Sequence, residues 1–136
     1  MSGEQLFKAA LGARELAYAP YSNFAVGAAL LSEDGSIYLG ANIENSSYGA
    51  TCCAERVALF KAVSEGKLRF SAIAIVGGGV GGELVNCYPC GICRQALAEF
   101  CDGGLIIYTG DENGIRETTL GALLPCAFEL EDRNLK

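Results

Sequence analysis

Four residues of this sequence have the side chains and the spacing of a catalytic metal site. Cys53 and Glu55 stand two positions apart in the run Cys-Ala-Glu, and Cys90 and Cys93 form a C-x-x-C pair that follows a proline. Three thiolates bind a divalent ion such as zinc and leave its fourth tetrahedral position open, where a nearby carboxylate can activate water. We therefore predict one zinc ion with Cys53, Cys90 and Cys93 as its ligands. Glu55 is the predicted acid–base residue.

Both parts of this set are expected at the start of a helix. Cys90 and Cys93 are three positions apart, so they share one helix face and can bind one ion. The partial positive charge of a helix N-terminus favours thiolate over thiol and offsets part of the repulsion among three anions. Residues two apart in a regular helix point in different directions. Cys53 and Glu55 can therefore cooperate only if Cys53 lies at the N-cap with non-helical dihedrals.

Two arginines next to the cysteines, Arg56 and Arg94, are candidates for outer contacts to the metal site. Each could donate hydrogen bonds to the sulfurs and reduce the excess negative charge of three thiolates. The same arginines could instead belong to an ordinary solvated helix face.

Two other interpretations of the cysteines stay open. A C-x-x-C pair at a helix start is also typical of thioredoxin-type redox proteins. A structural zinc site would need a fourth ligand, for which Cys52 and Cys87 are available. The sequence contains no histidine, so imidazole ligands and Ser-His or Cys-His nucleophilic chemistry are excluded.

The glycine-rich run at 77–82 formally matches the dinucleotide-binding pattern G-x-G-x-x-G. The residues that follow it do not open a helix whose N-terminus could bind a pyrophosphate. We interpret the run as a flexible loop.

Composition favours one oligomeric domain over residues 1–136, ending in an acidic tail. Hydrophobic residues make up 51% of the chain and charged residues only 19%, below the usual fraction of about 25%, so contact between copies of the chain would cover apolar surface. The formal net charge of −6 disfavours nucleic acid as a partner. No basic leader and no apolar run of about 18 residues is present, which predicts a cytoplasmic protein without a membrane partner.

The chain has seven cysteines, an odd number for a disulfide framework. Without a secretion signal, reduced thiols and metal binding are the better interpretation. Cys101 and Cys126, which lie outside the metal-binding motifs, are expected to be buried as small hydrophobic residues.

Periodicity and turn residues predict an α/β fold. Helices are expected at 5–19, 53–65, 90–100 and 119–124, and strands at 24–32, 36–41, 70–76, 105–109 and 115–118. This order predicts a three-layer α/β/α sandwich with a five-stranded mixed sheet. The polar segment 42–49 is expected to be a loop that could carry function.

Five motifs resemble those of one enzyme family. They are YSNFAVGAAL at 21–30, NIEN at 42–45, CAER at 53–56, CGICRQ at 90–95 and LLPCAF at 123–128. Together they resemble the small homotetrameric cytidine deaminases of the cytidine and deoxycytidylate deaminase superfamily, whose three-cysteine zinc signature includes P-C-x-x-C. The resemblance covers nearly the whole chain.

This resemblance implies hydrolytic deamination of cytidine and 2′-deoxycytidine to uridine products and ammonia, as in pyrimidine salvage. One zinc ion per subunit would be the cofactor. Glu55 would take a proton from water and deliver protons to the ring nitrogen and the departing amine, an acid–base contribution of about 10²–10⁴-fold.

The resemblance also implies contacts to a nucleoside substrate. Phe24 would pack against the base, and Asn42 and Glu44 would hydrogen-bond the ribose. The Glu44 carboxylate beside the sugar would repel a 5′-phosphate. Ala54, between Cys53 and Glu55, belongs to the same substrate-binding set.

Two further residues are implied to act between subunits. In the family's homotetramers, residues matching Tyr48 and Phe128 reach the pocket of a neighbouring subunit. The glycine-rich run and the Cys87-Tyr88 pair depart from the family pattern, at the edge of the base pocket.

Purely structural roles are the alternative for these residues: Phe24 could be a core residue, and Asn42 and Glu44 could shape a turn. A related enzyme acting on another aminopyrimidine nucleoside, such as a blasticidin-type antibiotic, is an alternative. A zinc-stabilised binding protein without catalysis is another.

Overall fold

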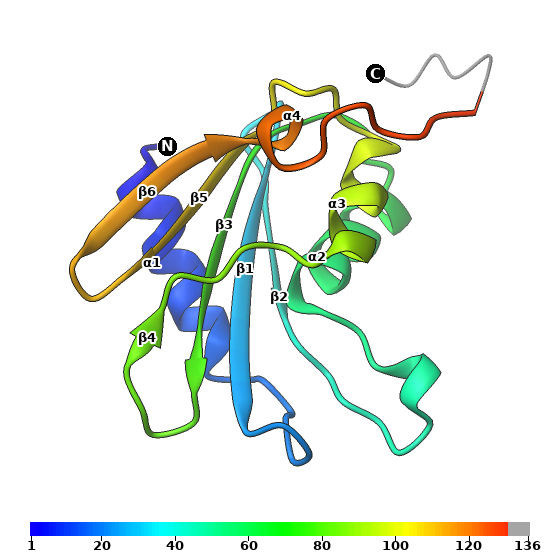
Figure 1. The fold of residues 1–136 in the computed structure, drawn as a ribbon. Coiled ribbons are helices and arrows are strands. Elements are labelled where there is room, and N and C mark those ends of the chain that lie inside the picture. Colours follow the sequence, from blue (N-terminus) through cyan, green and yellow to red (C-terminus); the bar gives the residue numbers. More distant parts are fainter. Residues whose placement is uncertain (131–136) are drawn as a thin grey trace.

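A mixed β-sheet lies between helices on both of its faces in the computed structural model of the chain (Figure 1). The structure describes residues 1–130, so the end of the expected acidic tail, 131–136, lies outside the described residues. The helices are α1 (Gly3–Arg14), α2 (Ala54–Ser64), α3 (Gly91–Ala98) and α4 (Leu120–Leu123), with a 3-10 turn at Tyr48–Ala50. The strands are β1 (Phe24–Ser32), β2 (Ile37–Ala41), β3 (Phe70–Gly79), β4 (Leu84–Val85), β5 (Ile106–Asp111) and β6 (Gly114–Thr119).

The sheet follows the order β2-β1-β3-β5-β6, and the short strand β4 pairs with β3 at one end. Strands β3 and β5 are parallel, and the other pairs are antiparallel. The predicted mixed sheet and the three-layer α/β architecture are therefore confirmed, with β4 as an additional strand.

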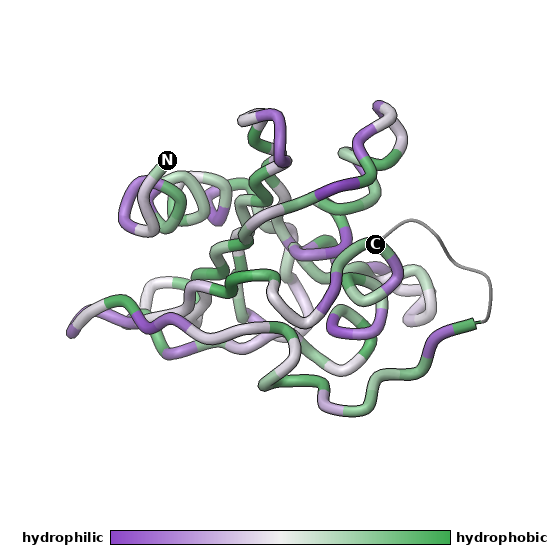
Figure 2. The backbone as a smooth tube through the Cα atoms, turned by 90° about the horizontal axis from the view of Figure 1, so that it is seen from above, coloured by the Kyte–Doolittle hydropathy of each residue, from purple (hydrophilic) through white to green (hydrophobic). Residues whose placement is uncertain are grey.

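Side chains on the two faces of the sheet form two separate cores. On one face α1 packs on small residues of the central strands, including Ala29 and Ala74. On the other face α2 and α3 cover larger side chains such as Leu30 and Ile73. Figure 2 shows alternating hydrophobic and hydrophilic residues along α1, next to the N label, as expected for a helix with one buried face.

Gly40 brings α2 unusually close to the sheet. A β-carbon at Gly40 would lie against the carbonyl oxygen of Ala54 and 2.6 Å from the backbone nitrogen of Ala58. Any other residue at position 40 would push the helix away. The first turn of α2, which begins directly after Cys53, is therefore placed by backbone contact.

The predicted boundaries of the first helix and of the glycine-rich loop were wrong. The first helix ends at Arg14 instead of residue 19, because Tyr18 leaves the helix to form a parallel bridge with Ile43. The glycine-rich run is not a free loop throughout. Its first three residues extend β3, where Gly77–Gly79 pair with Phe24–Val26 of β1.

Cys101 and Cys126, the two cysteines that were expected to be buried, differ from each other. Cys101 is buried, as predicted. Cys126 is exposed and has a positive φ of 54°, so the prediction of burial was wrong there. It directly follows Pro125 in the segment after α4, where the chain turns at the surface. Among the described residues, no helix is long and apolar enough to cross a membrane.

Candidate active site

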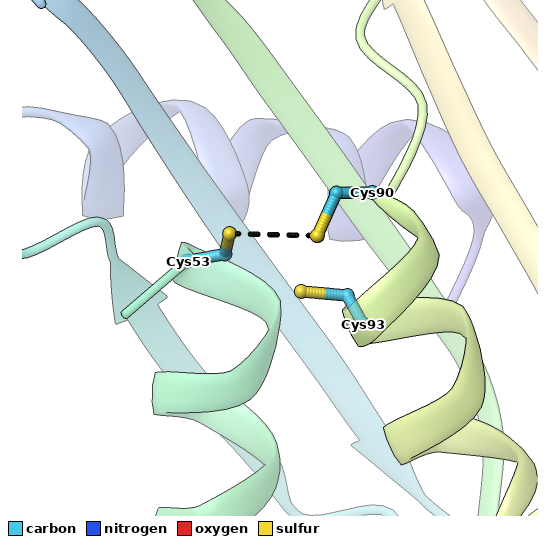
Figure 3. A group of neighbouring side chains, drawn as sticks. All are labelled: Cys53, Cys90 and Cys93. Carbon is cyan, nitrogen blue, oxygen red and sulfur yellow. Dashed lines mark hydrogen bonds between the residues drawn. The ribbon is translucent and has the colours of Figure 1, made fainter. Parts of the chain in front are cut away.

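Three cysteine sulfurs converge where the N-termini of α2 and α3 face each other (Figure 3). Cys53 is the N-cap of α2 with φ −70° and ψ 154°, and Cys90 is the N-cap of α3 with φ −66° and ψ 168°. Cys93 follows in the first turn of α3. The sulfurs of Cys53 and Cys90 are 3.7 Å apart, and all three lie within 4.8 Å of one another. The predicted extended N-cap at Cys53 is confirmed.

The cluster has three members and not four. Among the residues that the structure describes, neither Cys52 nor Cys87 belongs to the group that could hold a metal ion. A closed four-cysteine zinc site is therefore not supported by the geometry. Three donors would leave a coordination position for a reacting molecule.

The chemistry of the donors fits zinc. Hydrogen bonding from Cys93 lowers the pKa of Cys53 to about 5, with further help from Arg56. The pKa of Cys93 is raised, because its proton is held by Cys53 and because the side chain is buried. Cysteine binds metal as thiolate, and a dication would take the place of this shared proton.

Glu55 is buried beside the cluster, with only 4% of its surface exposed. Burial raises the pKa of its carboxyl to about 7, and the negative charge of Cys53 acts in the same direction. A carboxyl with a pKa near neutrality can both accept and return a proton, which is the property required of an acid–base catalyst.

The two arginines have different partners. Arg56 donates from Nη2 to the sulfur of Cys53 at 3.5 Å, as predicted. Arg94 donates from Nε to the carbonyl of Pro89 at 2.7 Å and from Nη1 to the carbonyl of Leu123 at 2.8 Å. The expected bond from Arg94 to a sulfur was therefore wrong. Through these two backbone carbonyls its guanidinium links the segment before α3 to the end of α4.

A cavity of about 300 Å³ opens beside the cluster. It is lined by Ser22, Phe24, Val26, Asn42, Glu44, Thr51, Cys52, Cys53, Ala54, Glu55, Cys87, Tyr88 and Cys90. The predicted residues Phe24, Asn42, Glu44 and Ala54 are thus brought together with the metal site. Tyr48 and Phe128 are 79% and 67% exposed and do not line this cavity within one chain.

Two polar residues that line the cavity, Glu44 and Asn42, are held in place by hydrogen bonds to neighbouring groups. Glu44 accepts hydrogen bonds from the backbone N–H groups of Tyr21 at 2.9 Å and Ser22 at 3.1 Å, and from the hydroxyl of Ser22. These bonds lower the pKa of Glu44, the Ser22 hydroxyl most strongly. Asn42 accepts from the N–H of Val26 and donates to the carbonyl of Phe24, both at 2.8 Å.

Each of these side chains keeps capacity for a ligand. Two carboxylate oxygens can accept about four hydrogen bonds, and an amide nitrogen carries two hydrogens, of which Asn42 uses one on Phe24. The cavity therefore combines a three-sulfur metal site with polar groups whose positions are fixed.

Comparison with known proteins identifies the group to which this site belongs. Residues 1–109 match the model of the cytidine and deoxycytidylate deaminase zinc-binding region. The chain belongs to this deaminase family. A cytidine deaminase from Sporosarcina psychrophila is 53% identical over 133 residues, which cover 97% of this chain and 95% of the relative. A cytidine deaminase from Halalkalibacterium halodurans is 53% identical over 135 residues, which cover 98% and 99%.

A solved structure agrees with this assignment. The crystal structure of cytidine deaminase from Burkholderia pseudomallei matches this deaminase with a TM-score of 0.85 and 46% identity, covering 94% of this chain and 100% of that chain. The three cysteines fall within the zinc-binding region of the family. Zinc is therefore the cofactor, and a redox pair is not the interpretation of Cys90 and Cys93.

The sequence-based prediction for this deaminase missed several residues that line the cavity. Ser22 lies inside a motif that carried the resemblance, but its bond to the Glu44 carboxylate depends on the folded loop. Cys87 was considered only as a possible fourth zinc ligand and, with Tyr88, as a departure from the family pattern. Both line the cavity.

Proposed function

We propose that this deaminase converts cytidine and 2′-deoxycytidine, with water, to uridine and 2′-deoxyuridine plus ammonia. The observation that carries the proposal is the buried Glu55 carboxyl beside three converging cysteine sulfurs, both bordering a cavity of about 300 Å³. The names of the relatives, which are cytidine deaminases at 53% identity, support the same substrate.

Glu55 is the residue that moves protons. A zinc ion held by the three cysteines would supply Lewis acidity that lowers the pKa of water. Glu55 takes a proton from the water as its oxygen bonds to the amine-bearing ring carbon. It gives this proton to the adjacent ring nitrogen. It then takes the remaining proton from the new hydroxyl and passes it to the amine, which leaves as ammonia when its bond to the ring carbon breaks and the carbonyl forms.

The remaining cavity residues orient the nucleoside. Phe24 packs against the base, and the backbone N–H of Ala54 faces the substrate because the first residues of a helix have no intrahelical acceptor. Asn42 and Glu44 hydrogen-bond the ribose. The Glu44 carboxylate, whose pKa is lowered, is ionised at neutral pH and would repel a 5′-phosphate.

The direct test is turnover of cytidine by the zinc-loaded protein. Loss of the cytidine absorbance, together with release of one ammonia per cytidine, is expected. Cytidine 5′-monophosphate is the matched comparison and should be converted much more slowly, because of Glu44. A zinc-loaded protein without turnover of cytidine would instead indicate a binding protein or another aminopyrimidine substrate.

We also propose a homotetramer in which neighbouring subunits share pockets. Leu16, Ile43 and Phe60 are 83%, 48% and 50% exposed, and Leu16 and Ile43 border an apolar cavity of about 200 Å³ beside β2 and α2. Contact between copies would cover this surface and would place Tyr48 and Phe128 at a neighbour's cavity. Light scattering should give four times the mass of 14.2 kDa; a monomer that is fully active would contradict the proposal.

The proposed setting is pyrimidine salvage in the cytoplasm. The metal site requires Cys53, Cys90 and Cys93 as reduced thiols, and the structure has them in that state. A reducing compartment maintains that state.

A further inference from the structure

Cys87 faces the active-site cavity without being a metal ligand. It lines the same cavity as Glu55, yet it lies outside the three-sulfur group. Its side chain also packs against the larger of the two cores. Neither zinc binding nor proton transfer therefore explains the position of this thiol.

A gap in strand β3 holds the Cys87 side chain. Gly77 has no side chain, and a β-carbon there would lie 3.0 Å from the sulfur of Cys87 and 3.2 Å from Cε2 of Phe24. Gly77 does not have a positive φ, so glycine is required for space and not for conformation. Cys87 and Phe24 therefore form one continuous wall of the cavity over Gly77.

This wall and Glu55 reach the cavity from different elements of the fold. Glu55 belongs to α2, which packs on β2 and β1 at one side of the sheet. Cys87 follows β4, which pairs with β3 on the other side of β1 (Figure 1). Phe24, on β1, lines the same cavity.

The position of a bound cytosine ring follows from the proposed function, on which this step rests. The amine-bearing carbon lies at the cysteine cluster, and the ring nitrogen next to it lies at Glu55. The other neighbour of that carbon is C5, so C5 points away from Glu55. We infer that Cys87, seated over Gly77, determines how large a C5 substituent on the pyrimidine the cavity accepts.

The test compares kcat/KM for 5-methylcytidine with that for cytidine. Cys87→Ala removes the sulfur and should raise this ratio about tenfold, whereas the larger side chain in Cys87→Val should lower it about tenfold, in line with one methyl group in an apolar pocket. Cys52→Ala is the matched control, because Cys52 is a thiol that lines the same cavity from the α2 side. Its ratio should stay within twofold of the wild-type ratio.

A second pair of variants tests the role of Gly77. Gly77→Ala would press on Cys87 and should lower the ratio, while the double variant Gly77→Ala/Cys87→Ala should restore it, because the new methyl group occupies part of the space that the sulfur leaves. Calorimetry gives the affinity ratio of 5-methyluridine to uridine, which should change in the same direction and tests the space around C5 without turnover. Zinc content is measured for every variant.

The outcomes separate the two proposals. A wild-type protein that holds zinc but does not convert cytidine overturns the proposed function and this inference with it. An active wild-type protein whose ratio stays within twofold in Cys87→Ala, in both turnover and binding, overturns this inference alone.

Discussion

The N-terminus of α1 is closed by its own side chains, whereas α2 and α3 begin at cysteines that make no side-chain cap hydrogen bond. At α1, Ser2 accepts from the N–H of Gln5 at 3.2 Å, and the Gln5 side chain accepts from the N–H of Ser2 at 2.9 Å. This capping box satisfies donors that a helix otherwise leaves unpaired. At Cys53 and Cys90 the cap dihedrals are the same extended ones, but the cap bond is missing.

The presence or absence of a side-chain cap distinguishes a helix start that stabilises the fold from one whose N–H groups are available to the active site. A side-chain cap contributes about 0.5–2 kcal/mol, and α2 and α3 each forgo it. In return, their N–H groups and partial positive charge remain available to thiolates and to a ligand. Extended cap dihedrals without a cap bond, found at two facing helices, are therefore a sign of a functional end.

The largest expected effect is at a cysteine cap itself. Cys90→Ala removes one of three ligands and should abolish both stoichiometric zinc and activity, a loss larger than the 10–100-fold that outer contacts typically contribute. Zinc analysis and cytidine turnover measure the two effects. Cys126→Ser, at an exposed thiol after α4, is the control and should keep its zinc. Full zinc and full turnover in Cys90→Ala would show that the ligands are misassigned.

Glu55→Gln should keep zinc but lower kcat by about 10²–10⁴-fold, because the amide has nearly the same shape and cannot accept the proton. This variant separates the two functions of the α2 terminus, metal binding and proton transfer. Zinc content and the kcat for cytidine are measured on the same sample. A kcat within tenfold of wild type would remove Glu55 from the proposed acid–base role.

Substitutions of Arg56 and Arg94 are expected to have smaller effects, and the two variants can be compared directly. Arg56→Gln removes the donor to the Cys53 sulfur and should weaken zinc affinity by about 10–100-fold. Arg94→Gln removes bonds to backbone carbonyls and should change thermal stability more than zinc affinity. Competition with a chelator gives the affinities. Equal losses of affinity in both variants would contradict the distinction.

Ser2→Ala tests the closed helix start. Loss of the capping box at α1 should lower the free energy of unfolding by about 1 kcal/mol without affecting kcat. Urea unfolding measures the first quantity and cytidine turnover the second. A drop in kcat with unchanged stability would mean that α1 is not purely structural.

Glu44 is an intermediate case, since it lies in the cavity but is bonded to backbone N–H groups like a cap. Its pKa is lowered in the folded state from the usual 4.5, so its ionised form stabilises the fold. This contribution is present above about pH 4.5 and is lost as the pH falls through the folded pKa. Urea midpoints of metal-free wild type and Glu44→Gln should therefore converge as the pH falls. A difference that grows in acid would contradict this sign.

Sequence reasoning succeeded where local chemistry constrained the answer. Cys53 had to be an N-cap, because only that geometry lets it cooperate with Glu55, and the structure has it there. The predictions were wrong where a residue far away in the sequence determines the local structure. The first helix ends early because Tyr18 pairs with Ile43, and Arg94 binds the carbonyl of Leu123, which only the folded chain brings close.

The glycine-rich run is a further case in which a distant segment determines the structure. Many glycines predict a loop, yet Gly77–Gly79 continue β3 because β1 offers a pairing partner. The space above Gly77 is needed for Cys87, a requirement that no local pattern contains. Tyr48 and Phe128 stay predictions, since their proposed partner is another copy of the chain.

The contact at Gly40 also bears on how this protein can change during evolution. Backbone atoms of α2 meet the sheet there, so this contact depends less on the exact apolar side chains elsewhere in the core. Neutral drift can exchange those side chains while the reactive end keeps its position. Residue 40 itself has no such freedom, because a single added methyl group would lift the helix start and the cysteine in front of it away from the sheet.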